Sequence, residues 1–131
     1  MVPVKLTEVF SSKSLSKKEI GDKGEELAVR HLKRQGYKIL ERNFSVHKIG
    51  EIDVVARDGE YLCFVEVRLR SYTYFGTPAQ TVTPEKQRRI VRTAEHYIKN
   101  NGLENSYVRF DVVEVYGDGK LVLIKDAFWA N

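Results

Sequence analysis

The sequence has few of the cysteine and histidine residues that form disulfides in small secreted domains or make zinc and thiol sites. Among 131 residues there is one cysteine, Cys63, so no disulfide can form within the chain. Cys63 lies in an apolar, strand-like run and is expected to be a small buried hydrophobic residue rather than a catalytic thiol. Three histidines, His31, His47 and His96, lack the spacing of zinc ligands. We therefore expect neither disulfide stabilisation nor zinc or thiol chemistry.

Long apolar runs are also missing. No stretch approaches the ~20 apolar residues that a membrane helix needs. Residues 1–18 contain no continuous apolar segment followed by a small-residue cleavage site. We therefore expect no membrane partner, no signal peptide and a cytoplasmic location. The net charge of +4 permits an anionic partner but does not require one.

Two segments have the periodicity of amphipathic helices. Ser16 and Glu19 form a capping box at the start of the first, and Gly36 fits a left-handed C-cap at its end. Its expected buried stripe is Ile20, Gly24, Leu27, Ala28, His31 and Leu32. The second helix is expected to begin at Thr83-Pro84, with Thr83 as N-cap, and to run to Gly102. Its first half is crowded with basic side chains, of which Arg88 and Arg92 are expected to form a solvated face.

Strand-like segments complete the pattern. They are residues 37–44, the two arms of 50–70, 107–116 and 120–125. The order α-β-β-β-α-β-β, with strands apolar on both faces, predicts one α/β domain over residues 14–131 with a sheet flanked by helices. Residues 1–13 are expected to be a loose N-terminal arm, and Trp129 is expected to pack on the core. Residues 71–83 are expected to be a loop whose aromatic side chains either cover the open end of the sheet or stack on unpaired bases: Tyr72, Tyr74 and Phe75.

The segment "GEIDVVARDGEYLCFVEVRLR", residues 50–70, predicts a hairpin with carboxylates among apolar residues. A two-residue turn at Asp58-Gly59 would pair Arg57 with Glu60. That register places Glu51 opposite Glu66, with Asp53 as the diagonal neighbour of Glu66 on the same face. The other face is uniformly apolar: Ile52, Val54, Ala56, Cys63, Val65 and Val67.

Converging carboxylates need a counter-charge, a proton or a metal ion. One interpretation is an ion-pair network in which Arg68 and Arg70 neutralise the acids. The other is a divalent-metal site, for which ligation by oxygen alone favours Mg²⁺ or Mn²⁺ over zinc. Spacing alone leaves both open.

These residues also carry a family resemblance. Asp53, twelve intervening residues and Glu66-Val67-Arg68 resemble the PD-(D/E)XK signature of the restriction-endonuclease-like superfamily. Together with "GDKGEELAVRHLKRQGYKILERN", "TPEKQRRIVRTAEHYI" and "RFDVVEV", the hairpin resembles the YraN-like family of uncharacterised bacterial proteins, which are similar to archaeal Holliday-junction resolvases. The likeness covers about residues 20–128 and implies a restriction-endonuclease-like mixed sheet flanked by helices, in agreement with the order above.

The resemblance implies a catalytic site made of Glu25, Asp53, Glu66 and Arg68, with Mg²⁺ or Mn²⁺ held by Asp53, Glu66 and Glu25. Without it, Glu25 would be an ordinary exposed helix glutamate. Arg68 departs from the pattern, which has lysine there. An arginine stays protonated and cannot be a general base, although it can hold a phosphate oxygen. It can also simply pair with Glu66.

The implied function is metal-dependent, structure-selective hydrolysis of nucleic-acid phosphodiesters, with branched or structured DNA as substrate. Candidate phosphate contacts are Arg70, Lys86 and Arg89. The resemblance to junction resolvases also makes a homodimer an expectation. The alternatives are a catalytically inactive nucleic-acid-binding module and a protein-interaction domain on the same fold.

Overall fold

The protein is described by a computed structural model that covers residues 16–71 and 82–130. The predicted N-terminal arm and the aromatic side chains of Tyr72, Tyr74 and Phe75 lie outside the described residues. The elements are α2 (Lys17–Arg34), β1 (Lys38–Val46), β2 (Gly50–Asp58), β3 (Tyr61–Arg70), α3 (Pro84–Asn100), β4 (Tyr107–Tyr116) and β5 (Leu121–Phe128). The predicted order α-β-β-β-α-β-β is confirmed.

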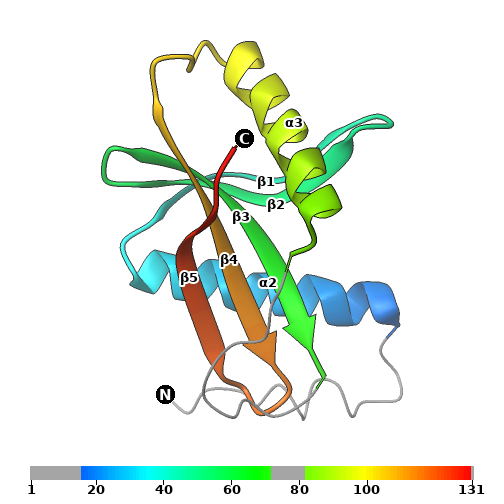
Figure 1. Ribbon diagram of the computed structural model, residues 1–131. Helices are drawn as coiled ribbons and strands as arrows, with labels where there is room; N and C mark the ends of the chain where they lie inside the picture. The colour runs from blue at the N-terminus through cyan, green and yellow to red at the C-terminus, as the bar shows by residue number, and fades with distance from the viewer. Residues whose placement is uncertain (1–15, 72–81, 131) are drawn as a thin grey trace.

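The strands form one mixed sheet in the order β1-β2-β3-β4-β5. Only the central pair, β3 and β4, is parallel, because α3 provides the crossover between them. The helices lie on opposite faces of the sheet (Figure 1). The α2 face is packed with Ala28, Leu32 and Val65 among others, and the α3 face with Phe64, Tyr97 and Phe110 among others. Burial on both faces explains why the central strands are so rich in valine.

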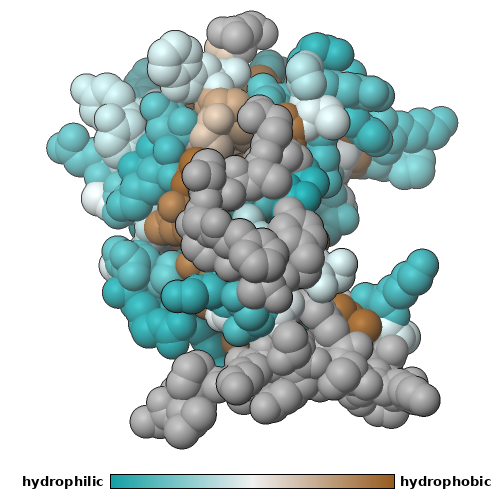
Figure 2. Space-filling model, turned by 60° about the horizontal axis from the view of Figure 1, so that its bottom comes forward, coloured by the Kyte–Doolittle hydropathy of each residue, from teal (hydrophilic) through white to brown (hydrophobic). Residues whose placement is uncertain are grey.

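Both helices begin as the sequence predicts. Ser16 accepts a hydrogen bond from the backbone of Glu19 and the Glu19 side chain reciprocates, so the capping box is formed. Thr83 caps α3 by accepting from the backbone N–H of Lys86. Within the described chain, neither helix combines the length and the apolar character required to cross a membrane. Most of the coloured surface in Figure 2 is hydrophilic, and the hydrophobic side chains form smaller patches on it.

The predicted hairpin register is wrong by two residues. Asp58 pairs with Tyr61, so Gly59 and Glu60 form the turn, with Gly59 at φ 60°. Asp58 stays in the strand because its carboxylate accepts hydrogen bonds from Arg109 at 2.7 Å and Lys125 at 3.0 Å. A shift of two keeps each side chain on its predicted face.

Some packing expectations are also wrong. Ile52 packs on the α3 face with Val55, not on the α2 face with Val54. In the predicted buried stripe of α2, Ile20, Leu27 and His31 are only half-buried, whereas Glu25 and Val29, which were not in that stripe, are buried.

Trp129 does not pack on the core but is 70% exposed. Asp126 adopts φ 54°, which turns the chain near the end of β5. Phe128 takes the core position and stacks on Phe110. Trp129 Nε1 instead donates to Asp126 Oδ1 at 3.1 Å.

Candidate functional site

Asp53 and Glu66 meet where β2 separates from β3. The last paired residues are Val54 and Val65, and continuing the register places Asp53 directly opposite Glu66. Beyond the last pair, the backbone N–H of Val67 donates to Asp53 Oδ2 at 2.8 Å. The Asp53 side chain thus bonds to the β3 backbone just beyond the last residues that pair between β2 and β3. This contact fixes Asp53 beside Glu66.

Glu66 carries an unsatisfied carboxylate oxygen. The residue is only 5% exposed, and its Oε2 accepts no hydrogen bond within the described chain. Lys86 Nζ lies 2.5 Å from this oxygen, but at angles that do not make a hydrogen bond, so the contact is an ion pair. The Lys86 side chain is 54% exposed and reaches Glu66 from the first turn of α3. A half-exposed lysine is therefore the counter-charge of a buried acid.

The proximity of the two acids is reflected in the protonation of Asp53. Burial and the neighbouring Glu66 carboxyl group, which lies within hydrogen-bonding reach, raise the pKa of Asp53 to about 8. The Val67 N–H opposes this shift, and the charge of Glu25 adds to it. Two adjacent carboxylates in a low-dielectric site favour retention of a proton unless a cation replaces it.

This arrangement predicts how the stability of the metal-free protein depends on pH. Because folding raises the pKa of Asp53 from ~3.9 in the unfolded chain to about 8, the native state binds the extra proton between these values. The contribution of Asp53 to the free energy of unfolding is therefore present at low pH and is lost as pH rises toward 8. The slope is at most about 1.4 kcal/mol per pH unit.

Urea unfolding of wild type and Asp53→Asn in EDTA, from pH 5 to 9, measures this contribution. The variant should gain stability relative to wild type as pH rises. Parallel stability profiles for the two proteins would show that Asp53 has no raised pKa.

Glu25 is brought toward this site by the close approach of α2. A Cβ at position 24 would collide with Leu69 of β3, so Gly24 permits the approach. Glu25 Oε1 accepts hydrogen bonds from Arg42 Nε and Asn43 Nδ2, both at 3.1 Å. Glu25 and Asp53 line one side of a hollow of about 300 Å³. Across residues 16–71 and 82–130, no three His, Cys, Asp or Glu side chains are grouped in position to hold a metal ion.

A second hollow, of about 490 Å³, opens on the α3 side of Asp53. Asp53 and Glu66 line it together with Lys86 and Arg89 of α3. The start of β2 packs closely on α3 there. A Cβ added at Gly50 would lie only 2.7 Å from Thr93 Oγ1, so only glycine fits without a shift of its neighbour. Arg89 also donates to the Ile49 carbonyl at 3.4 Å. The two acids and two of the three predicted phosphate-binding residues therefore share one open cavity.

The remaining predicted arginines have different surroundings. Arg68 is half-buried, and none of the ion pairs within the described segments includes it; Glu66 pairs with Lys86 instead. Arg70 Nε donates to Glu114 Oε2 at 2.6 Å. Arg70 and Arg68 thus do not form the predicted ion-pair network with Asp53 and Glu66.

Sequence reasoning missed Glu114. It is fully buried in β4, and its Oε1 accepts no hydrogen bond within the described chain. The feature of the sequence that could have indicated it is a glutamate between two valines at residues 113–115, the same arrangement as at residues 65–67 around Glu66. Because Arg68 pairs in register with Glu114, both buried glutamates lie on the α3 face of the central strands.

A separate buried network lies near the turn between β2 and β3. Asp111 accepts from Tyr37 at 2.7 Å and from Arg109 at 2.9 Å, and Arg109 also donates to Asp58. Burial and Asp111 together raise the pKa of Tyr37, so its hydroxyl stays protonated. These groups satisfy one another and have a structural role.

Comparison with known proteins identifies the family of this chain. The profile of the uncharacterised protein family UPF0102 matches residues 24–115. A UPF0102 protein of Caldicellulosiruptor saccharolyticus is 44% identical over 119 residues, which are 87% of this chain and all of the relative. One of Clostridioides difficile is 46% identical over 102 residues, covering 78% of this chain and 89% of the relative. The matched region includes Glu25, Asp53, Glu66 and Lys86, and confirms the predicted membership of the YraN-like family. The chain therefore belongs to the UPF0102 family.

Proposed function

We propose that this protein is a divalent-metal-dependent nuclease that hydrolyses DNA phosphodiesters. The observation that carries the proposal is the oxygen of Glu66, which is buried, accepts no hydrogen bond within the described chain and lies beside Asp53 in an open cavity. A buried carboxylate oxygen of this kind requires a cation or a proton. The only cation on it in the described chain is the half-exposed Lys86.

The donor set fits Mg²⁺ or Mn²⁺. Asp53 and Glu66 offer only carboxylate oxygens, which suit these hard cations better than zinc. Glu25 lies on the far side of Asp53, bound to Arg42 and Asn43, and would act through a water molecule or a second ion. When bound, the cation supplies Lewis-acid polarisation of a phosphodiester and acidifies a water molecule.

Lys86 compensates for the arginine at position 68. The superfamily pattern expects a lysine two residues after Glu66, where this chain has Arg68. Lys86 brings an ammonium group to the same carboxylate from α3. Arg68 stays protonated and contributes only positive charge and hydrogen-bond donors. We therefore assign to Lys86 the contact with the scissile phosphate or the attacking water.

The wall of the cavity suits a phosphate backbone. Lys86 and Arg89 line it together with Thr83, which caps α3. A helix N-terminus favours anions because its backbone N–H groups and dipole are positive there. These contacts recognise the phosphate backbone and do not distinguish one base from another. Selection among DNA substrates would therefore depend on their shape. Branched DNA is the first candidate because of the resemblance to junction resolvases.

A cleavage panel tests the proposal. Wild type, Asp53→Asn and Glu66→Gln are incubated with single-stranded, duplex, flap and four-way DNA in Mg²⁺, Mn²⁺ or EDTA. Wild type should cut at least one branched substrate only when metal is present. Each variant should lose at least about 100-fold in rate, since metal effects contribute several kcal/mol.

The control is Glu51→Gln, which changes an exposed acid at the rim of the same cavity and should keep most activity. Wild type that binds these substrates but cuts none of them in either metal would instead support an inactive nucleic-acid-binding module. Arg68 is the residue that favours this second candidate. Arg68→Lys would then show whether that position limits the chemistry, by gaining cleavage.

A further inference from the structure

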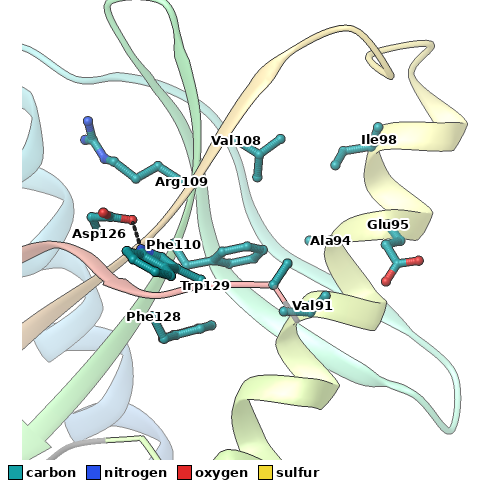
Figure 3. A pocket seen from close by; sticks show the side chains of 11 residues that line it. Val91, Ala94, Glu95, Ile98, Val108, Arg109, Phe110, Asp126, Phe128 and Trp129 are labelled. Atoms are coloured by element: carbon teal, nitrogen blue, oxygen red, sulfur yellow. Dashed lines mark hydrogen bonds between the residues drawn. The ribbon is translucent and has the colours of Figure 1, made fainter.

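Trp129 is the most exposed large hydrophobic side chain in the described part of the protein, at 70%. It is the only tryptophan in the sequence. Its indole N–H donates to Asp126 Oδ1 at 3.1 Å, and this contact fixes the orientation of the ring (Figure 3). An exposed aromatic ring oriented by a hydrogen bond presents a flat apolar face and loses less side-chain entropy on binding than an unrestrained one.

Two hollows adjoin this ring. One, of about 380 Å³, is apolar and lies between α3 and the end of the sheet, where Figure 3 shows Phe110 and Val91 near Trp129. The other, of about 370 Å³, lies along the outer side of α3 and is lined by Arg88 and Arg92 with Trp129. An aromatic platform beside two guanidinium groups is the combination that binds unpaired bases and their phosphates.

The charge of α3 favours an anionic partner, such as nucleic acid, over an apolar or basic one. The helix carries five basic and two acidic side chains, a net charge of +3 with His96 neutral. Glu95 also lines both hollows, and Asp126 lines the apolar one, where it accepts the indole hydrogen bond. The phosphates would therefore lie against Arg88 and Arg92, with a base on the indole.

The same helix connects this surface to the carboxylate cavity. Lys86 and Arg89 line that cavity, whereas Arg88 and Arg92, one turn apart, line the hollow beside Trp129. Residues 86 and 92 are separated along the helix axis by ~9 Å at 1.5 Å per residue. That distance corresponds to about three stacked nucleotides at 3.4 Å each. A strand leaving the cavity can thus cross the first turns of α3 and reach Trp129.

We propose that Trp129, Arg88 and Arg92 form a binding site for an unpaired nucleotide about three nucleotides away from the scissile phosphate. The proposal rests on the proposed function in taking nucleic acid as the ligand, and it names the feature of the substrate that is recognised. A substrate with a single-stranded segment next to the cleavage point satisfies both sites, whereas a blunt duplex has no free base for the indole.

The test uses the full chain in EDTA, where no metal-dependent cleavage occurs. An oligothymidylate single strand and a blunt duplex of equal length are titrated at two salt concentrations. Tryptophan fluorescence reports on Trp129 alone, and the anisotropy of labelled DNA measures binding independently. The single strand should quench the fluorescence to saturation.

Trp129→Ala should weaken single-strand binding ~5- to 160-fold, because stacking on an aromatic side chain is worth ~1–3 kcal/mol per base. Its affinity for the duplex should change less than twofold, and Trp129→Phe should retain most single-strand affinity. Arg92→Gln should weaken binding and reduce the salt slope for the single strand by about 0.7.

The outcomes separate this proposal from the nuclease. Single-strand binding with unchanged fluorescence, or with equal affinity for wild type and Trp129→Ala, overturns the stacking site even if the protein cuts DNA. Quenching and a weakened Trp129→Ala variant support the stacking site even if no substrate is cut. Wild type that binds neither DNA at the lower salt concentration overturns the stacking site.

Discussion

Lys86→Met is expected to slow DNA cleavage by about 100- to 1,000-fold at saturating Mn²⁺, because it removes the positive charge that we propose to contact the reacting phosphate. The same variant should bind Mn²⁺ more tightly than wild type. In the metal-free protein Lys86 neutralises Glu66 from 2.5 Å and so competes with any other cation for that oxygen. Substitution of a residue that only stabilises the fold would not be expected to lower the cleavage rate and at the same time raise the affinity for Mn²⁺.

Lys99→Met is the matched control, since Lys99 lies in the last turn of the same helix. It should leave the rate and the Mn²⁺ affinity within about twofold of wild type. Lys86→Arg keeps the charge and should retain part of the activity. If Lys86→Met cut DNA at the wild-type rate, Lys86 would be only the counter-charge of Glu66, and the phosphate contact assigned to it would be wrong.

Arg70→Met is expected to lower the free energy of unfolding by about 3–5 kcal/mol, because it leaves a buried charge without its partner. Arg70 Nε donates to Glu114 Oε2 at 2.6 Å, and Glu114 is fully buried. The other carboxylate oxygen of Glu114 accepts no hydrogen bond in the part of the chain that the structure describes. Urea denaturation at pH 8 measures the effect.

The double variant Arg70→Met, Glu114→Met separates the ion pair from side-chain packing. Replacing a buried pair by apolar residues is often neutral, so the second change should recover most of the lost stability. A double variant as unstable as Arg70→Met alone would mean that the loss comes from other contacts of Arg70. The arginine is still a predicted phosphate ligand, but its position is fixed by Glu114.

The secondary structure could be predicted because its signals are local. Ser16 with Glu19, and Thr83 with Pro84, lie within one turn of the helix starts that they determine. The hairpin register could not be predicted this way. Asp58 looked like a turn residue, but Arg109 and Lys125, more than fifty residues away, hold its carboxylate in the strand.

The candidate site was predicted in part for the same reason. The alternation of side chains placed Asp53 and Glu66 on one face, and a register error of two residues left that unchanged. Their counter-charges could not be read from spacing. Lys86 reaches Glu66 across the α3 side of the sheet, and Arg70 meets Glu114 across 44 residues of sequence.

Trp129 shows the limit of arguments from hydrophobicity. An aromatic residue after an apolar strand is expected to be buried. Here the left-handed backbone at Asp126 lets Phe128 occupy the core, and the indole remains outside. A single positive-φ residue that is not glycine or asparagine gives little warning in a sequence.

The central claim is that Asp53 and Glu66 together bind one divalent cation. Calorimetric titration of Mn²⁺ at pH 8 tests it most directly, with wild type, Asp53→Asn, Glu66→Gln and the exposed-site control Glu95→Gln. The account predicts one binding site in wild type and Glu95→Gln that is lost or weakened at least tenfold in both carboxylate variants. Equal Mn²⁺ affinity in all four proteins, or no binding to wild type, would contradict it.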